Sequence, residues 1–301
     1  MSYILDINNA IAQSVATVKA NAKKNGWTMR EPDYVAALTT EFPKRIAGLI
    51  PGVRYGGCFI HQKPLITFTS TIDGNQYRCE LGDLLIICRK TVDGKKRYNA
   101  ALLQFKKANR KSLTIYKRSE RAQLEVYESW PKFTIPNIPG QFDVQPKTVN
   151  LGAQYALIYE SAGQYHSMYA HIPQTTMSFS SDLTLGRFIN DLMDWQDGRT
   201  INEEPKKDEE EWSRLIWALV GTSKTAVMNN SRAKIFNKKP RAAGEFFDFI
   251  CDTGSIIFNP ENVEENAENG ISLLFIDDKR QEVMPQEKDQ LFEQYPKDDV
   301  Q

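Results

Sequence analysis

Three polar residues in the first half of the chain have the types and the spacing that phosphodiester hydrolysis requires. Asp83, Gln104 and Lys106 offer one carboxylate, one amide oxygen and one ammonium group. Hard oxygen ligands hold a divalent cation, and a positive group beside them can orient the attacking water or stabilise the charge that develops on the phosphate. These residues form a candidate catalytic group if the fold brings them together.

A tight hairpin would bring them together. Asp93-Gly94 is a dipeptide typical of two-residue hairpin turns. With this turn, facing positions have numbers that sum to 187, so Asp83 lies opposite Gln104. Residues two apart on a strand share a face, and Lys106 therefore joins them, semi-exposed at the edge of the core. A bulge or a longer loop would shift this register and separate the three side chains.

The elements around the hairpin follow from hydrophobic periodicity. An amphipathic helix over residues 33–50 is interrupted at Pro43 and stopped by Pro51-Gly52. Strands are expected over residues 65–72, 76–88 and 96–106, separated by Asp73-Gly74 and Asp93-Gly94, and they form an antiparallel meander. A charged helix over 119–129 and a strand over 155–160 follow. The predicted order is helix, three-stranded meander, helix, strand.

The motif Glu80-Leu81-Gly82-Asp83, then a hairpin, then Leu102-Leu103-Gln104-Phe105-Lys106 resembles the PD-(D/E)xK nuclease superfamily. The predicted order of elements is also similar to the superfamily's. The resemblance implies an α/β fold with a restriction-endonuclease-like core over roughly the first 160 residues. It implies Mg²⁺ as the cofactor, with Mn²⁺ as a substitute, held by Asp83 and Gln104. Lys106 would be the catalytic ammonium group.

The motif departs from the family at two positions. Gln104 stands where the family has an acidic residue, and the usual proline before the first aspartate is absent. Glu80 is a nearby carboxylate that would restore the missing charge. Glu41 on the first helix is similar to the additional helix carboxylate that many members aim at the metal, and is a third metal-ligand candidate.

The predicted helix after the lysine contains Gln123-Leu124-Glu125-Val126-Tyr127. Gln and Tyr at this spacing share a helix face. The pair resembles the Q-x-x-x-Y element of RecB-like members, in which that face borders the active site. The resemblance gives Gln123 and Tyr127 supporting roles.

Basic residues surround the motif, although the formal net charge of the chain is zero. Residues 88–121 contain twelve Lys or Arg against two acidic residues, a local net charge of +10. A solvated face is the simple explanation, but the position beside the motif favours a surface that binds a polyanion. The candidate phosphate-binding residues are Lys107, Arg110, Lys111, Lys117 and Arg118.

The second half of the chain shows helical periodicity over 185–195 and 210–228, with a charged linker at 199–208 between them. Residues 259–301 carry a net charge of −8. The predicted division is a nuclease core with N-terminal helices over 1–160, a mostly helical extension over 161–285 packed on the core, and an acidic, partly mobile tail over 286–301.

Composition favours a cytoplasmic protein, because the chain has neither a membrane-length apolar run nor a secretory-signal pattern. The four cysteines lack zinc-ligand spacing and are expected to be reduced thiols. The predicted function is a magnesium-dependent deoxyribonuclease, and the resemblance implies bacterial restriction or phage defence. RNA as substrate, a homo-oligomer, and a protein partner on the C-terminal half or acidic tail are left open. The alternative is a catalytically degenerate nucleic-acid-binding or scaffold subunit of a defence or repair complex.

Overall fold

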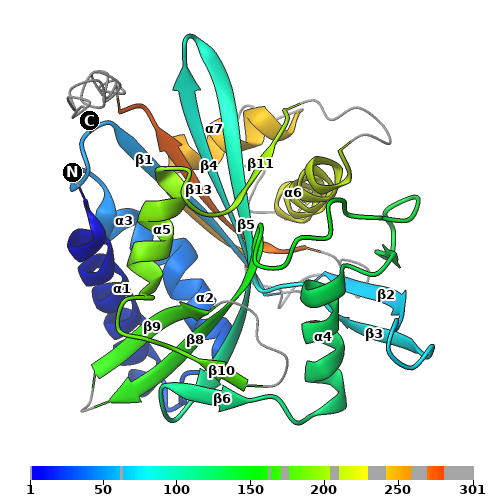
Figure 1. The fold of residues 1–301 in the computed structure, drawn as a ribbon. Coiled ribbons are helices and arrows are strands. Elements are labelled where there is room, and N and C mark those ends of the chain that lie inside the picture. The colour runs from blue at the N-terminus through cyan, green and yellow to red at the C-terminus, as the bar shows by residue number, and fades with distance from the viewer. Residues whose placement is uncertain are drawn as a thin grey trace, which may run out of the picture.

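A large mixed β-sheet with helices on both faces organises the computed structural model of the chain (Figure 1). The structure describes residues 2–61, 64–161, 164–170, 176–203, 210–229, 242–258 and 270–280. Within these residues the sheet has eight strands, and their path is β12-β1-β13-β4-β5-β8-β9, with β11 paired to β5. The strands are β1 (Val53–Ile60), β4 (Leu84–Val92), β5 (Lys95–Ala108), β8 (Ala153–Ser161), β9 (Gln164–Ala170), β11 (Arg199–Ile201), β12 (Ser255–Phe258) and β13 (Ser272–Asp278).

Helices cover the two faces of this sheet in separate layers (Figure 1). One layer packs on the face that carries Leu103 and Phe105, and the other packs on the face that carries Leu102 and Tyr155. The first layer contains α1 (Ile4–Lys24), α2 (Glu31–Ala36), the π-helical turn η1 (Ala37–Glu41), α3 (Phe42–Ile46) and α5 (Leu185–Met193). The second contains α4 (Arg118–Ser129), α6 (Glu211–Asn229) and α7 (Ala243–Thr253).

The β4–β5 hairpin has the predicted register. Val92 pairs with Lys95, and the pairing continues to Leu84 and Leu103. Asp93 and Gly94 both have positive φ, 51° and 72°, as a type I′ turn requires. After β5 the chain passes through α4 and returns as β8, which pairs with β5 in parallel. The hairpin, α4 and β8 thus form one continuous unit at the centre of the molecule.

The predicted meander is only partly present. The run 76–88 is two strands, β3 (Gln76–Glu80) and β4, separated at residues 81–83. β3 does not join the central sheet but pairs with β2 (Leu65–Thr69), which pairs with β7 (Phe133–Thr134) in a small separate sheet. A second small sheet joins β6 (Ser112–Thr114) to β10 (Thr176–Ser178). Both predicted hairpins, β2–β3 and β4–β5, are therefore confirmed, but they lie in different sheets, so the continuous three-stranded meander is wrong.

The C-terminal half also differs from the predicted mostly helical extension. Its strands β9, β11, β12 and β13 all join the central sheet. β13 lies between β1 and β4, so a strand from the end of the chain pairs with two strands from its first third. The expected acidic tail over 286–301 lies outside the described residues. Within the described part of the chain no helix combines the length and the apolar character needed to cross a membrane.

Candidate functional site

Asp83 and Gln104 meet at the start of β4. The Asp83 backbone N–H donates to the Leu103 carbonyl at 2.9 Å, which extends the hairpin pairing by one residue. The Asp83 carboxylate then accepts the backbone N–H of Phe105 at 2.6 Å on Oδ2. Gln104 Nε2 donates to the same oxygen. Two donors from β5 therefore fix the carboxylate on the face that carries Gln104.

The other end of the Gln104 amide is an open acceptor. Gln104 is only 1% exposed, and its Oε1 is buried with no hydrogen-bond partner among the described residues. Buried polar atoms are nearly always paired, so an orphaned oxygen indicates a missing donor or cation. An amide oxygen next to a carboxylate is a hard-oxygen set suited to Mg²⁺ or Mn²⁺. Gln104 Oε1 and the Asp83 carboxylate are thus the candidate oxygen ligands of this site.

Lys106 is held from the opposite side by α4. Its Nζ donates to Gln123 Oε1 at 3.0 Å. Gln123 Nε2 lies 3.5 Å from Glu80 Oε2, at the long limit for a hydrogen bond. The predicted Lys106, Gln123 and Glu80 are therefore consecutive members of one polar chain, which runs from β5 through α4 to the end of β3.

Tyr127, one turn after Gln123 on α4, fixes the break between β3 and β4. Its hydroxyl donates to the Leu81 carbonyl at 2.7 Å. A Cβ on Gly82 would come within 3.0 Å of the Tyr127 hydroxyl and 2.8 Å of Leu102 Cδ1, so a residue with a side chain would require the Leu102 side chain to shift. Burial raises the pKa of Tyr127 well above its usual value, and the residue acts as a neutral donor. Tyr127 thereby positions the chain immediately before Asp83.

Asp83 and Lys106 are more buried than expected. Asp83 is 6% exposed and Lys106 is 9% exposed. Both side chains were expected to be semi-exposed, but β8 and β13 continue the sheet on both sides of the hairpin and α4 covers this face. The polar side chains are consequently held at fixed positions within the packed core.

Glu41 does not join the group, contrary to expectation. Glu41 is the last residue of η1. Leu38 within η1 and Phe42 directly after it pack in the core on the sheet face of Leu103 and Phe105, which is opposite to the face of Gln104. The Glu41 carboxylate accepts from Lys44 Nζ at 2.8 Å. Periodicity predicts that Glu41 lies on a helix, but it does not determine which side of the sheet that helix covers.

The candidate phosphate-binding residues fall into two groups. Lys107 and Arg118 have protein partners, because Lys107 Nζ donates to the Met29 carbonyl at 2.9 Å and Arg118 Nε donates to the Tyr77 hydroxyl at 2.8 Å. Arg110, Lys111 and Lys117 are exposed. Lys107 and Arg118 are exposed as well, so the two groups differ in their protein contacts and not in their access to solvent.

Glu125 belongs to the same helix and was not predicted as a site residue. It is 5% exposed, and its carboxylate accepts from Ser70 Oγ at 2.7 Å, Thr71 N at 2.6 Å and Thr71 Oγ1 at 3.0 Å. Glu125 thus ties α4 to the loop between β2 and β3. The position of Glu125 inside the Q-x-x-x-Y motif was one indication of a role in the site. A charged residue on the exposed face of a helix would produce the same sequence pattern, so the pattern alone does not identify Glu125.

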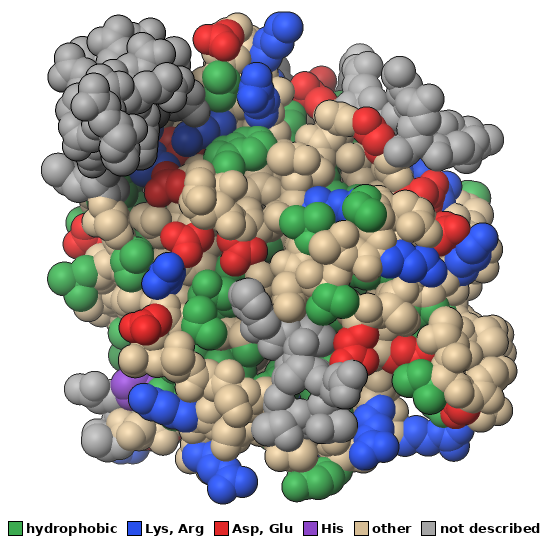
Figure 2. Space-filling model, viewed as in Figure 1, with side chains coloured by type: hydrophobic (Ala, Val, Ile, Leu, Met, Phe, Trp, Pro, Cys, Tyr) green, Lys and Arg blue, Asp and Glu red, His purple; other side chains and the backbone are tan. Residues whose placement is uncertain are grey.

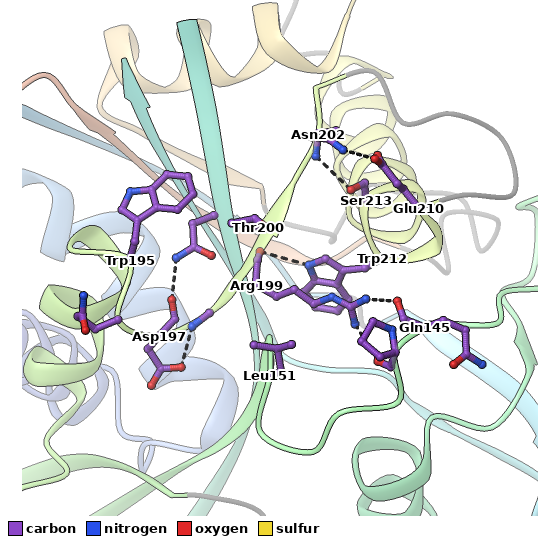
Figure 3. A pocket seen from close by; sticks show the side chains of 14 residues that line it. Gln145, Leu151, Trp195, Asp197, Arg199, Thr200, Asn202, Glu210, Trp212 and Ser213 are labelled. Carbon is purple, nitrogen blue, oxygen red and sulfur yellow. Dashed lines mark hydrogen bonds between the residues drawn. The ribbon is translucent and has the colours of Figure 1, made fainter. Parts of the chain in front are cut away.

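A cavity of about 500 Å³ lies apart from these residues, between β11, the start of α6 and the loop before β8 (Figure 3). Trp212 and Arg199 form one wall, and burial lowers the pKa of Arg199. Some polar groups of its lining are paired, as when Arg199 Nη1 donates to the Pro146 carbonyl at 3.3 Å, whereas Trp195 Nε1 and Glu210 Oε2 are buried without a hydrogen-bond partner among the described residues. None of the Asp83 group lines this cavity.

Among the residues that the structure describes, no three His, Cys, Asp or Glu side chains gather as a metal site. The candidate donor set instead combines carboxylate and amide oxygens. No family model, curated protein or solved structure matches the chain. The local geometry and the sequence motif are therefore the observations that bear on function.

Proposed function

We propose that the chain is a metal-dependent nuclease with a restriction-endonuclease-like core, and that it hydrolyses DNA phosphodiester bonds. The observation that carries the proposal is the common face shared by Asp83, Gln104 and Lys106. The hairpin register sets this arrangement, and the contact from Gln123 restrains the ammonium group. The unit β4, β5, α4 and β8 supports the same reading, because it is the hairpin, helix and strand that the motif requires.

Asp83 and Gln104 would hold the Mg²⁺ or Mn²⁺ ion, with Glu80 as the nearest further carboxylate in the polar chain. A divalent cation in such a site neutralises phosphate charge and lowers the pKa of a bound water. Lys106 would orient the attacking water or stabilise the negative charge that develops on the phosphate. Gln123 keeps the Lys106 ammonium in place by accepting its hydrogen bond. Bacterial restriction or phage defence in the cytoplasm is the role that the resemblance implies.

A second candidate is a nucleic-acid-binding subunit that does not cleave. It is favoured by the contact between Gln104 Nε2 and the Asp83 carboxylate, since a neutral amide supplies less charge to a cation than the usual acidic residue. The exposed cations Arg110, Lys111 and Lys117 would serve either function. The two candidates differ in one measurable property, cleavage.

The test incubates purified protein with plasmid DNA, single-stranded DNA and RNA in magnesium, manganese or chelator. The variant is Lys106→Ala, and Lys24→Ala is the matched control because Lys24 is an exposed lysine at the end of α1, in the opposite helix layer. Metal-dependent cutting that Lys24→Ala retains and Lys106→Ala loses supports the nuclease. Salt-sensitive binding without cutting under any metal supports the non-cleaving alternative.

A further inference from the structure

Tyr116 is an aromatic side chain that the fold directs into solvent. It is 76% exposed, whereas its neighbour Ile115 is 1% exposed and packs in the core. A large ring at this exposure gains nothing from burial in the folded chain. Its position between a buried anchor and the start of α4 makes it a fixed feature of the surface.

The backbone on both sides of Tyr116 is held in regular structure. Before it, β6 pairs with β10 from Ser112 to Thr114. After it, α4 begins at Arg118, and Arg121 N donates to the Lys117 carbonyl at 3.0 Å. A tyrosine side chain has only two rotatable torsions to order on binding. The ring can therefore meet a planar ligand at a low cost in conformational entropy.

Exposed cations flank Tyr116 in the sequence. Arg110, Lys111, Lys117 and Arg121 are exposed, and Glu120 is the only acidic residue of the sequence between 110 and 121. Figure 2 shows Lys and Arg side chains along the lower edge of the molecule, below β6 and the start of α4 in Figure 1. An exposed ring among cations suits a ligand that has both negative charge and flat aromatic faces.

Tyr116 lies two residues before the start of α4, the helix that carries Gln123. Gln123 contacts Lys106 directly. α4 thus links the polar chain of the candidate site to the exposed segment that carries Tyr116.

We propose that Tyr116 stacks on an unpaired nucleobase, and that the natural substrate of the site is single-stranded nucleic acid. In a duplex the base faces are covered by neighbouring base pairs, so the ring could reach only sugar and phosphate. In a single strand every base offers a face for stacking, while Arg110, Lys111 and Lys117 contact the phosphates. This inference rests on the proposed function for the identity of the ligand, but it concerns binding and not cleavage.

The test compares wild type with Tyr116→Ala and Tyr116→Phe. Binding of fluorescein-labelled oligothymidylate and of a labelled duplex of equal length is measured by anisotropy in chelator, so that no strand is cut. We expect Tyr116→Ala to weaken single-strand binding by about tenfold or more, to change duplex binding by less than about twofold, and to leave the fold intact. Tyr116→Phe keeps the ring and should bind like wild type.

Three results would overturn the inference: tighter wild-type binding to duplex, unchanged single-strand binding by Tyr116→Ala, or equal weakening for both ligands. Arg110→Gln provides the matched comparison, because loss of a phosphate contact weakens both ligands and reduces the salt dependence. Because every binding measurement is made in chelator, stacking by Tyr116 can be observed even if the chain does not cleave. It can also fail while cleavage is observed, so the two failures are distinct.

Discussion

The backbone N–H of Phe105 donates to Asp83 Oδ2 at 2.6 Å, at the end of the β4–β5 hairpin that lies away from its turn. The bond ties a side chain of one strand to the main chain of the next. Phe105 itself packs on the opposite face of the sheet, where it is fully buried. The position of the carboxylate is thus coupled to core packing on both faces.

This coupling predicts different outcomes for two substitutions of Asp83. Asp83→Ala leaves the Phe105 N–H and the Gln104 amide without an acceptor, and should reduce the free energy of unfolding by about 1–3 kcal/mol. Asp83→Asn keeps an oxygen for the Phe105 N–H and should lose less stability, but it removes the charge that holds a cation. Urea denaturation should therefore separate the variants, whereas both should lose cutting. An Asn variant that cuts at the wild-type rate would exclude Asp83 as a metal ligand.

The contact between Gln123 and Lys106 predicts that substitution of Gln123 changes the cleavage rate, because it changes the position of Lys106. Gln123→Leu removes the acceptor 3.0 Å from Lys106 Nζ, and displacement of a catalytic group can lower the rate by up to about 100-fold. Gln123→Glu keeps an acceptor and should retain most of the rate. The measurement is the cleavage rate at saturating and limiting substrate, with the urea midpoint as a check on folding. A fall in kcat with little change in KM is expected, and a change in KM alone would argue against positioning.

The hairpin register was predictable because it depends on local chemistry. Asp93 and Gly94 tolerate positive φ, so they select a two-residue turn, and that turn determines that Leu84 faces Leu103. The helix that carries Gln123 and Tyr127 was predictable for the same reason, and observed α4 begins one residue earlier than expected. The shared face of Asp83, Gln104 and Lys106 follows from this local information.

Long-range pairing was not predictable from the same patterns. β13 inserts between β1 and β4 although it is nearly two hundred residues away in sequence, and its short apolar run has no period that identifies a partner. The break between β3 and β4 also comes from tertiary packing, because Gly82 lies against Tyr127 and Leu102. Burial of Asp83 and the misplacement of Glu41 follow from these long-range contacts.

The contacts of Glu125 predict that its substitution increases local opening of the loop between β2 and β3. Glu125→Ala removes the acceptor of three hydrogen bonds from Ser70 and Thr71, and should reduce the free energy of unfolding by about 2–3 kcal/mol. Amide hydrogen exchange should rise in the loop 70–75, most directly at Thr71, whose N–H donates to Glu125. Glu125→Gln keeps acceptor oxygen and should show a smaller increase. Unchanged exchange at Thr71 in the Ala variant would contradict the contact.

The ion pairs of Asp277 predict that the stability of the fold depends on pH. It is 1% exposed and accepts from Arg89 Nε at 2.9 Å and Arg54 Nε at 3.1 Å. Burial alone would raise the pKa of Asp277, but the hydrogen bonds from Arg89 and Arg54 outweigh burial and lower it. Asp277→Asn leaves the buried Arg89 charge with weaker compensation, and should cost about 3 kcal/mol or more at neutral pH.

The sign of the pH effect follows from the lowered pKa. A carboxyl whose pKa is lower in the folded state stabilises the fold above its unfolded pKa of about 3.9, and this contribution is lost as the pH falls through the folded value. The difference in unfolding free energy between wild type and Asp277→Asn should therefore be constant near neutral pH and shrink below about pH 4. Asp252→Asn is the matched control, because Asp252 also pairs with Arg54 but its side chain is 64% exposed, and it should cost less than about 1 kcal/mol. A difference for Asp277→Asn that stays the same at acid pH would show that packing, rather than the ionised carboxylate, accounts for the loss.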